Sequence, residues 1–216
     1  MRTILLALAL LTGQAHAQAS SECDPPGLFR IVTANNSPGI PKDSFARKPK
    51  VTYRAGNGQV RQEEMPDTEG GIHQLSVIHW PDLWVVNLLD KTGQHVVDDS
   101  PKSDVTIAAL GVEPSDGLPP AWAALEFGCE WKFFAANKAV QAPTSKDDMV
   151  KHQITDGAWR VTLMTARDSQ TPWALILAKD GIAVYAIRYL SYEHRAEVDP
   201  ALFAKPEGIK FVEPLK

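Results

Sequence analysis

Short runs of alternating apolar and polar residues recur along most of this 216-residue sequence. A period of two is typical of β-strands with one face buried and the other in water. Asn-Gly at residues 57–58 and Asp-Gly at residues 156–157 and 180–181 favour tight turns between runs. The pattern predicts one large, curved antiparallel sheet, with strands at residues 27–33, 50–54, 59–64, 72–80, 83–89, 94–98, 105–110, 149–155, 158–166, 173–178 and 182–192.

The strand at residues 83–89, within the central stretch 70–99, is apolar at both parities. Leu83 and Val85 fall on one side, and Trp84, Val86 and Leu88 fall on the other. A strand that is apolar on both faces needs cover on both faces. We therefore expect a helix or a ligand on one side of this strand and other elements on the opposite side.

One segment follows a helical period instead. Ala124, Phe127, Trp131 and Phe134 are spaced by three, four and three residues, which places them on one helical face. Two adjacent prolines just before them suit a first helical turn. We predict a helix over residues 119–137 that covers the sheet. The predicted fold class is therefore α+β and mostly β: a large curved antiparallel sheet, or open half-barrel, covered by a central helix.

The first residues predict export. A basic start, an apolar run at residues 4–11 and a small-x-small site at residues 15–17 are typical of a cleaved signal peptide. That run is too short to span a bilayer, and no other run is long enough for a transmembrane helix. We expect residues 1–17 to be a signal peptide and residues 18–216 to be a single periplasmic domain. An uncleaved anchor is the alternative.

The chain has two cysteines, Cys23 and Cys129. In an exported chain an even pair predicts a disulfide, which would tie the mature N-terminus to the middle of the chain. Free thiols or a metal pair are the alternative, although no CxxC motif is present.

Two segments resemble the periplasmic lipoprotein carriers of the LolA/LolB type. Residues 82–87 (DLWVVN) leading to residues 94–97 (QHVV) are similar to a strand and turn of that family. Residues 198–209 (VDPALFAKPEGI) are similar to the family's ending, in which a Phe strand runs into a Pro-x-Gly closure. The resemblance implies an open curved sheet wrapped around helices. The carriers have a characteristic Arg inside their cavity, a role that the resemblance does not transfer to Arg30, and a disulfide is not typical of them.

Composition and motifs argue against several functions. Lys and Arg number 22 against 26 Asp and Glu, the net charge is −4 and no basic stripe is present, so nucleic acid and anionic membrane surfaces are poor partners. The sequence lacks G-x-S-x-G, Walker, H-E-x-x-H and G-x-G-x-x-G motifs, and nothing marks a nucleophile. We expect a protein that is not an enzyme and needs no cofactor.

The abundance of aromatic residues favours a binding role. A curved sheet with a helix across its mouth can enclose an apolar cavity that binds a lipid, a lipoprotein acyl chain or another apolar ligand. We expect six residues to line that cavity: Trp84, Val86, Leu88, Phe127, Trp131 and Phe134. The alternative is that these side chains simply fill the core.

Three histidines in the central stretch suggest a different function. His73 and His79 are six residues apart and share a strand face, His95 could approach either across the ladder, and Asp98 and Asp99 follow. Imidazoles and a carboxylate suit Zn or Cu, so a metal-binding protein is one alternative. The simpler interpretation is that the histidines are surface or half-buried residues of the sheet, polar partners in the alternating pattern. A structural envelope protein that acts through partners is a further alternative.

Overall fold

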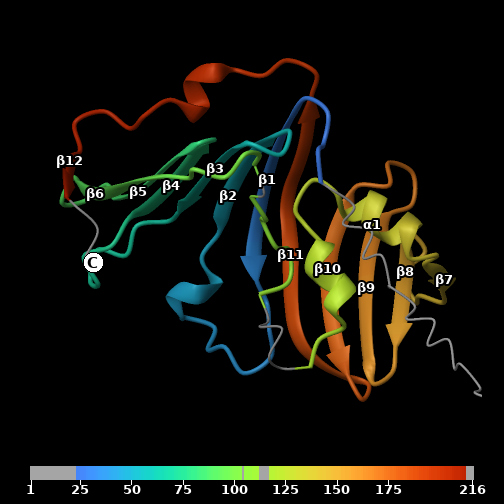
Figure 1. Cartoon of the computed structure of the whole chain (residues 1–216). Helices are drawn as coiled ribbons and strands as arrows, with labels where there is room; N and C mark the ends of the chain where they lie inside the picture. The colour runs from blue at the N-terminus through green and yellow to red at the C-terminus, as the bar shows by residue number, and fades with distance from the viewer. Residues whose placement is uncertain (1–22, 104, 112–116, 213–216) are drawn as a thin grey trace, which may run out of the picture.

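The computed structural model describes residues 23–103, 105–111 and 117–212. Their strands form one curved, unclosed sheet of twelve strands in the order β12-β6-β5-β4-β3-β2-β1-β11-β10-β9-β8-β7 (Figure 1). Neighbouring strands are antiparallel, except that β12 runs parallel to β6. The described residues include one short α-helix, so the predicted fold class is confirmed.

The bounds of the elements follow the predicted strands closely between residues 27 and 98 and again from residue 149 to residue 192. The elements are β1 (Leu28–Asn35), the 3-10 helix η1 (Phe45–Arg47), β2 (Lys50–Ala55), β3 (Gln59–Glu64), β4 (Gln74–His79), β5 (Asp82–Asn87), β6 (Thr92–Val97), the 3-10 helix η3 (Pro120–Ala124), α1 (Glu130–Ala136), β7 (Val140–Ala142), β8 (Met149–Asp156), β9 (Trp159–Ala166), β10 (Pro172–Lys179), β11 (Ile182–Arg195), the 3-10 helix η4 (Pro200–Phe203) and β12 (Lys210–Val212). The short edge strands β7 and β12 were not predicted.

The helix predicted over residues 119–137 is wrong as one continuous element. The 3-10 helix η3 ends at Ala124, and α1 begins only at Glu130. Between them Glu126 forms an isolated β-bridge with Ala108, to which the strand predicted at residues 105–110 is reduced. Gly128 has a φ of 87°, a left-handed conformation that glycine adopts without steric cost and that a helix cannot contain.

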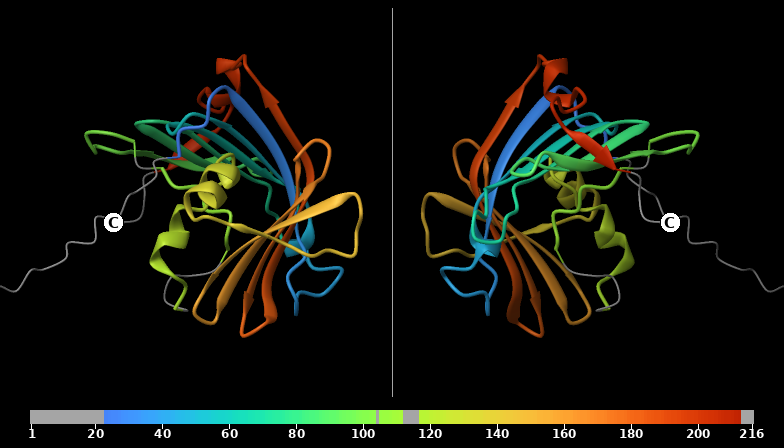
Figure 2. Two further views of the ribbon diagram at one scale, coloured as in Figure 1. Left: turned by 90° about the vertical axis from the view of Figure 1, so that its right-hand side faces the viewer. Right: turned by 90° about the vertical axis from the view of Figure 1, so that its left-hand side faces the viewer.

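The inner face of the sheet carries the main core. Residues 105–111 and 117–137, here called the inner segment, pack on the side chains of β1 and β8–β11. Figure 2 shows the sheet curving around this segment. The largest buried side chains that the segment contributes are Trp122, Leu125, Phe127, Phe133 and Phe134.

The opposite, outer face is covered by residues 196–212, here called the C-terminal strap. Phe203 packs with Leu28 and Ala55, and further along the strap Ile209 and Phe211 pack against β4 and β5. The strand that the family resemblance implies around Phe203 is instead the 3-10 helix η4. Asp199 caps this helix by accepting a hydrogen bond from the Ala201 N–H (2.9 Å), and a proline occupies its first turn.

The disulfide predicted from the sequence is present in the structure. A disulfide joins Cys23 to Cys129 across 106 positions and ties the start of the described chain to the residue before α1. The predicted signal peptide, residues 1–17, lies outside the described residues. None of the helices in the described part of the chain is long and apolar enough to cross a membrane.

Candidate functional site

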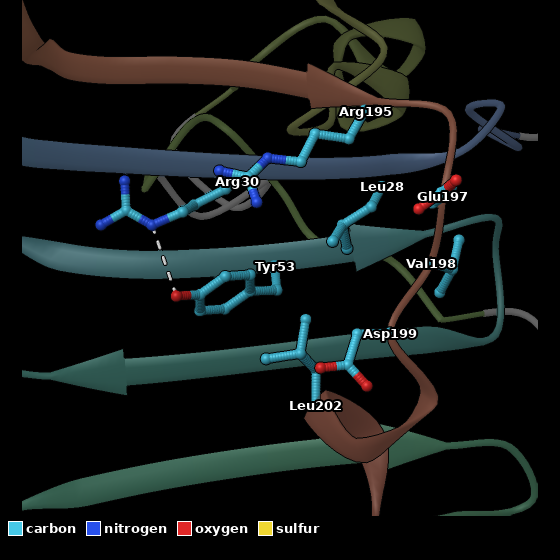
Figure 3. Close-up of a pocket in the computed structure, with 8 residues that line it drawn as sticks. All are labelled: Leu28, Arg30, Tyr53, Arg195, Glu197, Val198, Asp199 and Leu202. Atoms are coloured by element: carbon cyan, nitrogen blue, oxygen red, sulfur yellow. Dashed lines mark hydrogen bonds between the residues drawn. The ribbon is translucent and has the colours of Figure 1, made fainter.

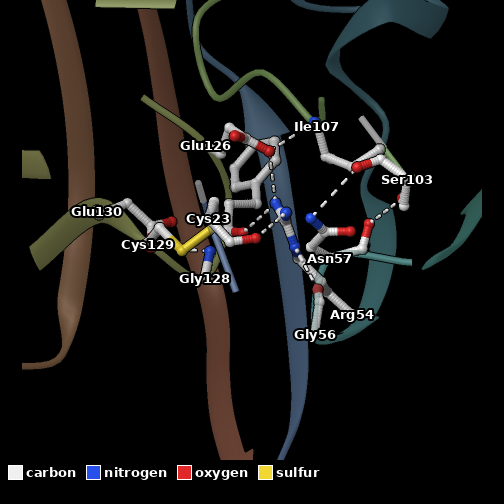
Figure 4. A network of polar contacts seen from close by, with 11 residues as sticks. Cys23, Arg54, Gly56, Asn57, Ser103, Ile107, Glu126, Gly128, Cys129 and Glu130 are labelled. Carbon is white, nitrogen blue, oxygen red and sulfur yellow. Dashed lines mark hydrogen bonds and ion pairs between the residues drawn. A yellow bond between two sulfur atoms is a disulfide. The ribbon is translucent and has the colours of Figure 1, made fainter. Parts of the chain in front are cut away.

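A buried arginine fixes the inner segment to the sheet. Arg54, on β2, is fully buried on the inner face. Its Nη1 donates to Glu126 Oε2 (2.8 Å) and to the Phe127 carbonyl (3.1 Å), while Nη2 donates to the Cys23 carbonyl (2.9 Å) (Figure 4). Glu126 Oε2 also accepts the Ile107 N–H (3.0 Å). One guanidinium therefore holds β2, Cys23 and the inner segment in a fixed arrangement.

A second buried carboxylate lies at the start of α1. Glu130 accepts hydrogen bonds from the hydroxyl groups of Tyr189 (3.0 Å) and Tyr192 (2.8 Å) and from the Gly128 N–H (2.9 Å). Burial raises the pKa of Glu130, although the hydrogen bonds oppose that shift. Burial also raises the pKa of both tyrosines, and the nearby Glu130 carboxylate adds to the effect. The cluster anchors α1 to β11.

Beyond these anchors, part of the inner face remains open. Strand pairing places Val60, Ile78, Leu83 and Val96 side by side in one row across β3–β6. Val60 is buried, Ile78 and Leu83 are half-buried, and Val96 is 43% exposed. Val85, in the next row, is 37% exposed. These five residues form an apolar strip, here called the inner-face strip, that runs from the interior to the open end of the sheet.

The structure covers one of the two apolar faces of β5 with protein, so the expected cover of the other face, by a helix or a ligand, stays a prediction. Trp84 and Val86 are buried under the C-terminal strap, whereas Leu83 and Val85 face the open inner side. The period of two identified both apolar faces of this strand correctly. Which face is covered depends on a strap that lies far along the chain, so the sequence pattern of the strand alone does not determine it.

The six predicted ligand-lining residues fall into two separate clusters. Phe127, Phe134 and the half-buried Trp131 belong to the main core under the inner segment. Trp84, Val86 and Leu88 belong to the cluster under the strap, on the opposite face of the sheet. The structure does not bring the two groups together, and their role in ligand binding stays a prediction.

The three histidines of the metal hypothesis have separate partners. His73 Nε2 lies 3.3 Å from Glu63 Oε1, and His79 Nε2 lies 3.4 Å from Gln59 Nε2. His95 Nε2 lies 2.6 Å from Asp82 Oδ1, and its ring stacks on Trp84. Within residues 23–103, 105–111 and 117–212, no three His, Cys, Asp or Glu side chains are placed to hold a metal ion together.

Several solved structures are similar to this chain at low sequence identity. An uncharacterised conserved protein from Thermus thermophilus aligns over 87% of this chain and 90% of its own, with a TM-score of 0.43 and 10% identity. MucB aligns over 87% of this chain and 60% of its own, with a TM-score of 0.43 and 12% identity. A LolA superfamily protein from Nitrosomonas europaea aligns over 87% of this chain and 94% of its own, with a TM-score of 0.37 and 12% identity.

Of the three, the Nitrosomonas europaea protein is described as a member of the LolA superfamily. At these identities and TM-scores, the three structures say nothing about the ligand or activity of this chain. No protein-family model and no curated protein matches the sequence.

Proposed function

We propose that this protein is an exported, non-enzymatic binding protein that holds a lipid or another apolar ligand against the inner-face strip. The observation that carries the proposal is the uncovered row of Ile78, Leu83 and Val96 with the neighbouring Val85. The disulfide supports export to an oxidising compartment such as the periplasm. A lipoprotein acyl chain is one ligand of the required kind.

The strip has the physical properties that an acyl chain needs. It is continuous with the interior at Val60, so a chain lying on it passes from the open end of the sheet toward buried surface. Each methylene removed from water contributes about 0.8 kcal/mol. Arg54, which pairs with Val60 across β2 and β3, holds the adjoining inner segment in place. The binding surface is therefore preorganised on one side.

The test uses two adjacent residues of β6 that point to opposite faces. Val96 belongs to the strip, whereas its neighbour Val97 is 59% exposed on the outer side, paired with Asp82. We expect the double variant Val85→Asn/Val96→Asn to bind a dansylated undecanoic acid at least ten-fold more weakly than the wild type, because two uncharged polar groups replace apolar contacts of about 1.4 kcal/mol or more in total.

The matched control is Val97→Asn, which should bind the fluorescent fatty acid as the wild type does. Native mass spectrometry of the protein purified from periplasm should show a co-purifying lipid, which the double variant loses. Wild-type protein that binds neither the fatty acid nor any cellular lipid would refute the proposal. Equal binding by all three proteins would show that the ligand lies elsewhere.

The alternative of a structural envelope protein makes a different prediction for the same surface. In that case chemical crosslinking in cells should join the chain to another protein through the strip, and the double variant should lose that crosslink while lipid is absent from the wild type.

A further inference from the structure

The C-terminal strap and the sheet enclose a second candidate site, on the face opposite the inner-face strip. A pocket of about 460 Å³ lies there, between the first residues of β1, the middle of β2 and residues 195–202 (Figure 3). This volume is within the range of roughly 300–1,000 Å³ typical of small-molecule sites. Its apolar lining consists of Leu28 and Tyr53 from the sheet and of Val198 and Leu202 from the strap.

One end of the pocket is cationic. Arg30 and Arg195 both lie in its wall and both contact one carboxylate, that of Glu193, at 2.8 and 3.1 Å. Tyr53 and Ser191 hold Arg30 further, at 3.3 Å from Nε and 3.4 Å from Nη1 respectively. Two guanidiniums sharing a single carboxylate leave one positive charge uncompensated. The described contacts of Arg30 use Nε and Nη1, which leaves Nη2 available to an anionic group.

The other end of the pocket is acidic. Figure 3 shows Glu197 and Asp199 on the side away from the Arg30 guanidinium. Asp199 Oδ1 caps η4 through the Ala201 N–H, which fixes its orientation and leaves Oδ2 for a ligand. Glu197 is exposed, and the ion pairs found between described residues do not include it. The pocket therefore has separated charges of opposite sign on either side of an apolar lining.

From this arrangement we infer that the outer pocket binds a small zwitterion with an apolar body. The carboxylate or phosphate of the ligand lies against Arg30 and Arg195, its ammonium group lies between Glu197 and Asp199, and its apolar part covers Leu28 and Leu202. Charge-assisted hydrogen bonds to a planar guanidinium give such a site both strength and orientation. A free short peptide and the head group of phosphatidylethanolamine share this chemistry.

The experiment follows chemical shifts of the ¹⁵N-labelled full chain during titration with two zwitterions. One is leucyl-leucine, and the other is dihexanoyl phosphatidylethanolamine below its micellar concentration, with dihexanoyl phosphatidylglycerol as the lipid that lacks an ammonium group. We expect saturable shifts confined to β1, β2 and residues 195–202 with at least one zwitterion. Binding of the peptide identifies a free zwitterion as the ligand class, and binding of the lipid alone identifies a head group. If neither zwitterion changes the chemical shifts of these residues at millimolar concentration, the inference is wrong.

Ligands that lack one of the two charges test which end of the pocket binds which charged group. If leucyl-leucine binds, Arg195→Gln should weaken its binding at least five-fold, but should not change the binding of the C-amidated peptide, which has no carboxylate. Glu197→Gln should weaken the binding of leucyl-leucine similarly, but should not change the binding of the N-acetylated peptide, which has no ammonium group. If only the lipid binds, Glu197→Gln should not change the binding of dihexanoyl phosphatidylglycerol, which has no ammonium group. Both side chains are exposed, so neither change threatens folding. Glu207→Gln, an exposed carboxylate further along the strap, is the matched control. Equal sensitivity of blocked and free ligands would overturn the assignment of charges.

Discussion

Arg54 Nη1 lies 2.8 Å from Glu126 Oε2, and both side chains are almost completely buried, with 1% and 9% of their surfaces exposed. The pair joins the second strand of the sheet to the loop between η3 and α1. Because the guanidinium also bonds the carbonyl groups of Cys23 and Phe127, its charge is fully surrounded by protein acceptors. A buried pair of this kind is costly to break, since removing one partner leaves the other charge uncompensated.

Substituting Glu126 should therefore destabilise the fold strongly. We expect Glu126→Gln to lower the free energy of unfolding by about 3–5 kcal/mol, measured by urea denaturation. Glu64→Gln is the matched control, because the half-buried Glu64 on β3 pairs with the exposed Lys50 on β2, and the change should cost less than about 1 kcal/mol. Equal effects of the two changes would show that Arg54 does not depend on Glu126.

The disulfide should contribute on a similar scale. Cys23 and Cys129 close a loop with a sequence separation of 106 residues, and the chain-entropy estimate for such a loop is about 4–5 kcal/mol. We expect Cys23→Ser/Cys129→Ser to lower the urea midpoint of unfolding, and reduction of the wild-type protein to lower it by the same amount. An unchanged midpoint in both experiments would contradict this expectation.

The strap should be held mainly by one aromatic side chain. Phe203 is completely buried between Leu28 and Ala55, so Phe203→Ala creates a cavity and should cost about 3–5 kcal/mol. Val212, 46% exposed in β12 of the same strap, provides the comparison, since Val212→Ala should change stability by less than about 0.5 kcal/mol. Differential scanning calorimetry measures both. A small effect of Phe203→Ala would show that the strap is held elsewhere.

The strands were predictable because each is marked by local signals. Asn57-Gly58 and Asp156-Gly157 mark hairpin turns, and alternation fixes the strands beside them. The helix was overestimated because the spacing of Phe127, Trp131 and Phe134 fits a helical face even though the backbone turns at Gly128. The 3-10 helix η4 did have a local signal, an Asp cap followed by proline, which the expected strand ending concealed.

The two candidate sites were less predictable than the fold. Strand alternation named Leu83 and Val85 as one face of β5, but the strap that covers the other face follows β11 and lies far along the chain from β5. The outer pocket brings Arg30 and Tyr53 to the strap, segments that are separated by more than a hundred residues in sequence and meet only in the folded chain. The spacing of residues within either segment does not predict that the two segments come together.

Glu130 should make stability depend on pH above the ordinary glutamate pKa. Burial raises its pKa in the folded chain above the ordinary glutamate value of about 4.3, which applies to the unfolded chain. As the pH rises past that value, the unfolded chain releases the proton while the folded chain retains it. The folded state then binds more protons, so the free energy of unfolding falls with rising pH until the raised pKa of Glu130 is passed, and stays lower above it.

The variant Glu130→Gln removes this titration. We expect its free energy of unfolding, relative to that of the wild type, to increase from pH 4 to pH 8 and to be least favourable at the acidic end, where the wild-type carboxyl is mostly protonated in both states. Urea unfolding at a series of pH values measures the difference, and groups common to both proteins, such as His152, cancel in it. Glu64→Gln, at a half-buried position paired with the exposed Lys50, should run nearly parallel to the wild type. If Glu130→Gln also runs parallel, then the hydrogen bonds from Tyr189, Tyr192 and Gly128 offset the burial of Glu130 and its pKa is not raised.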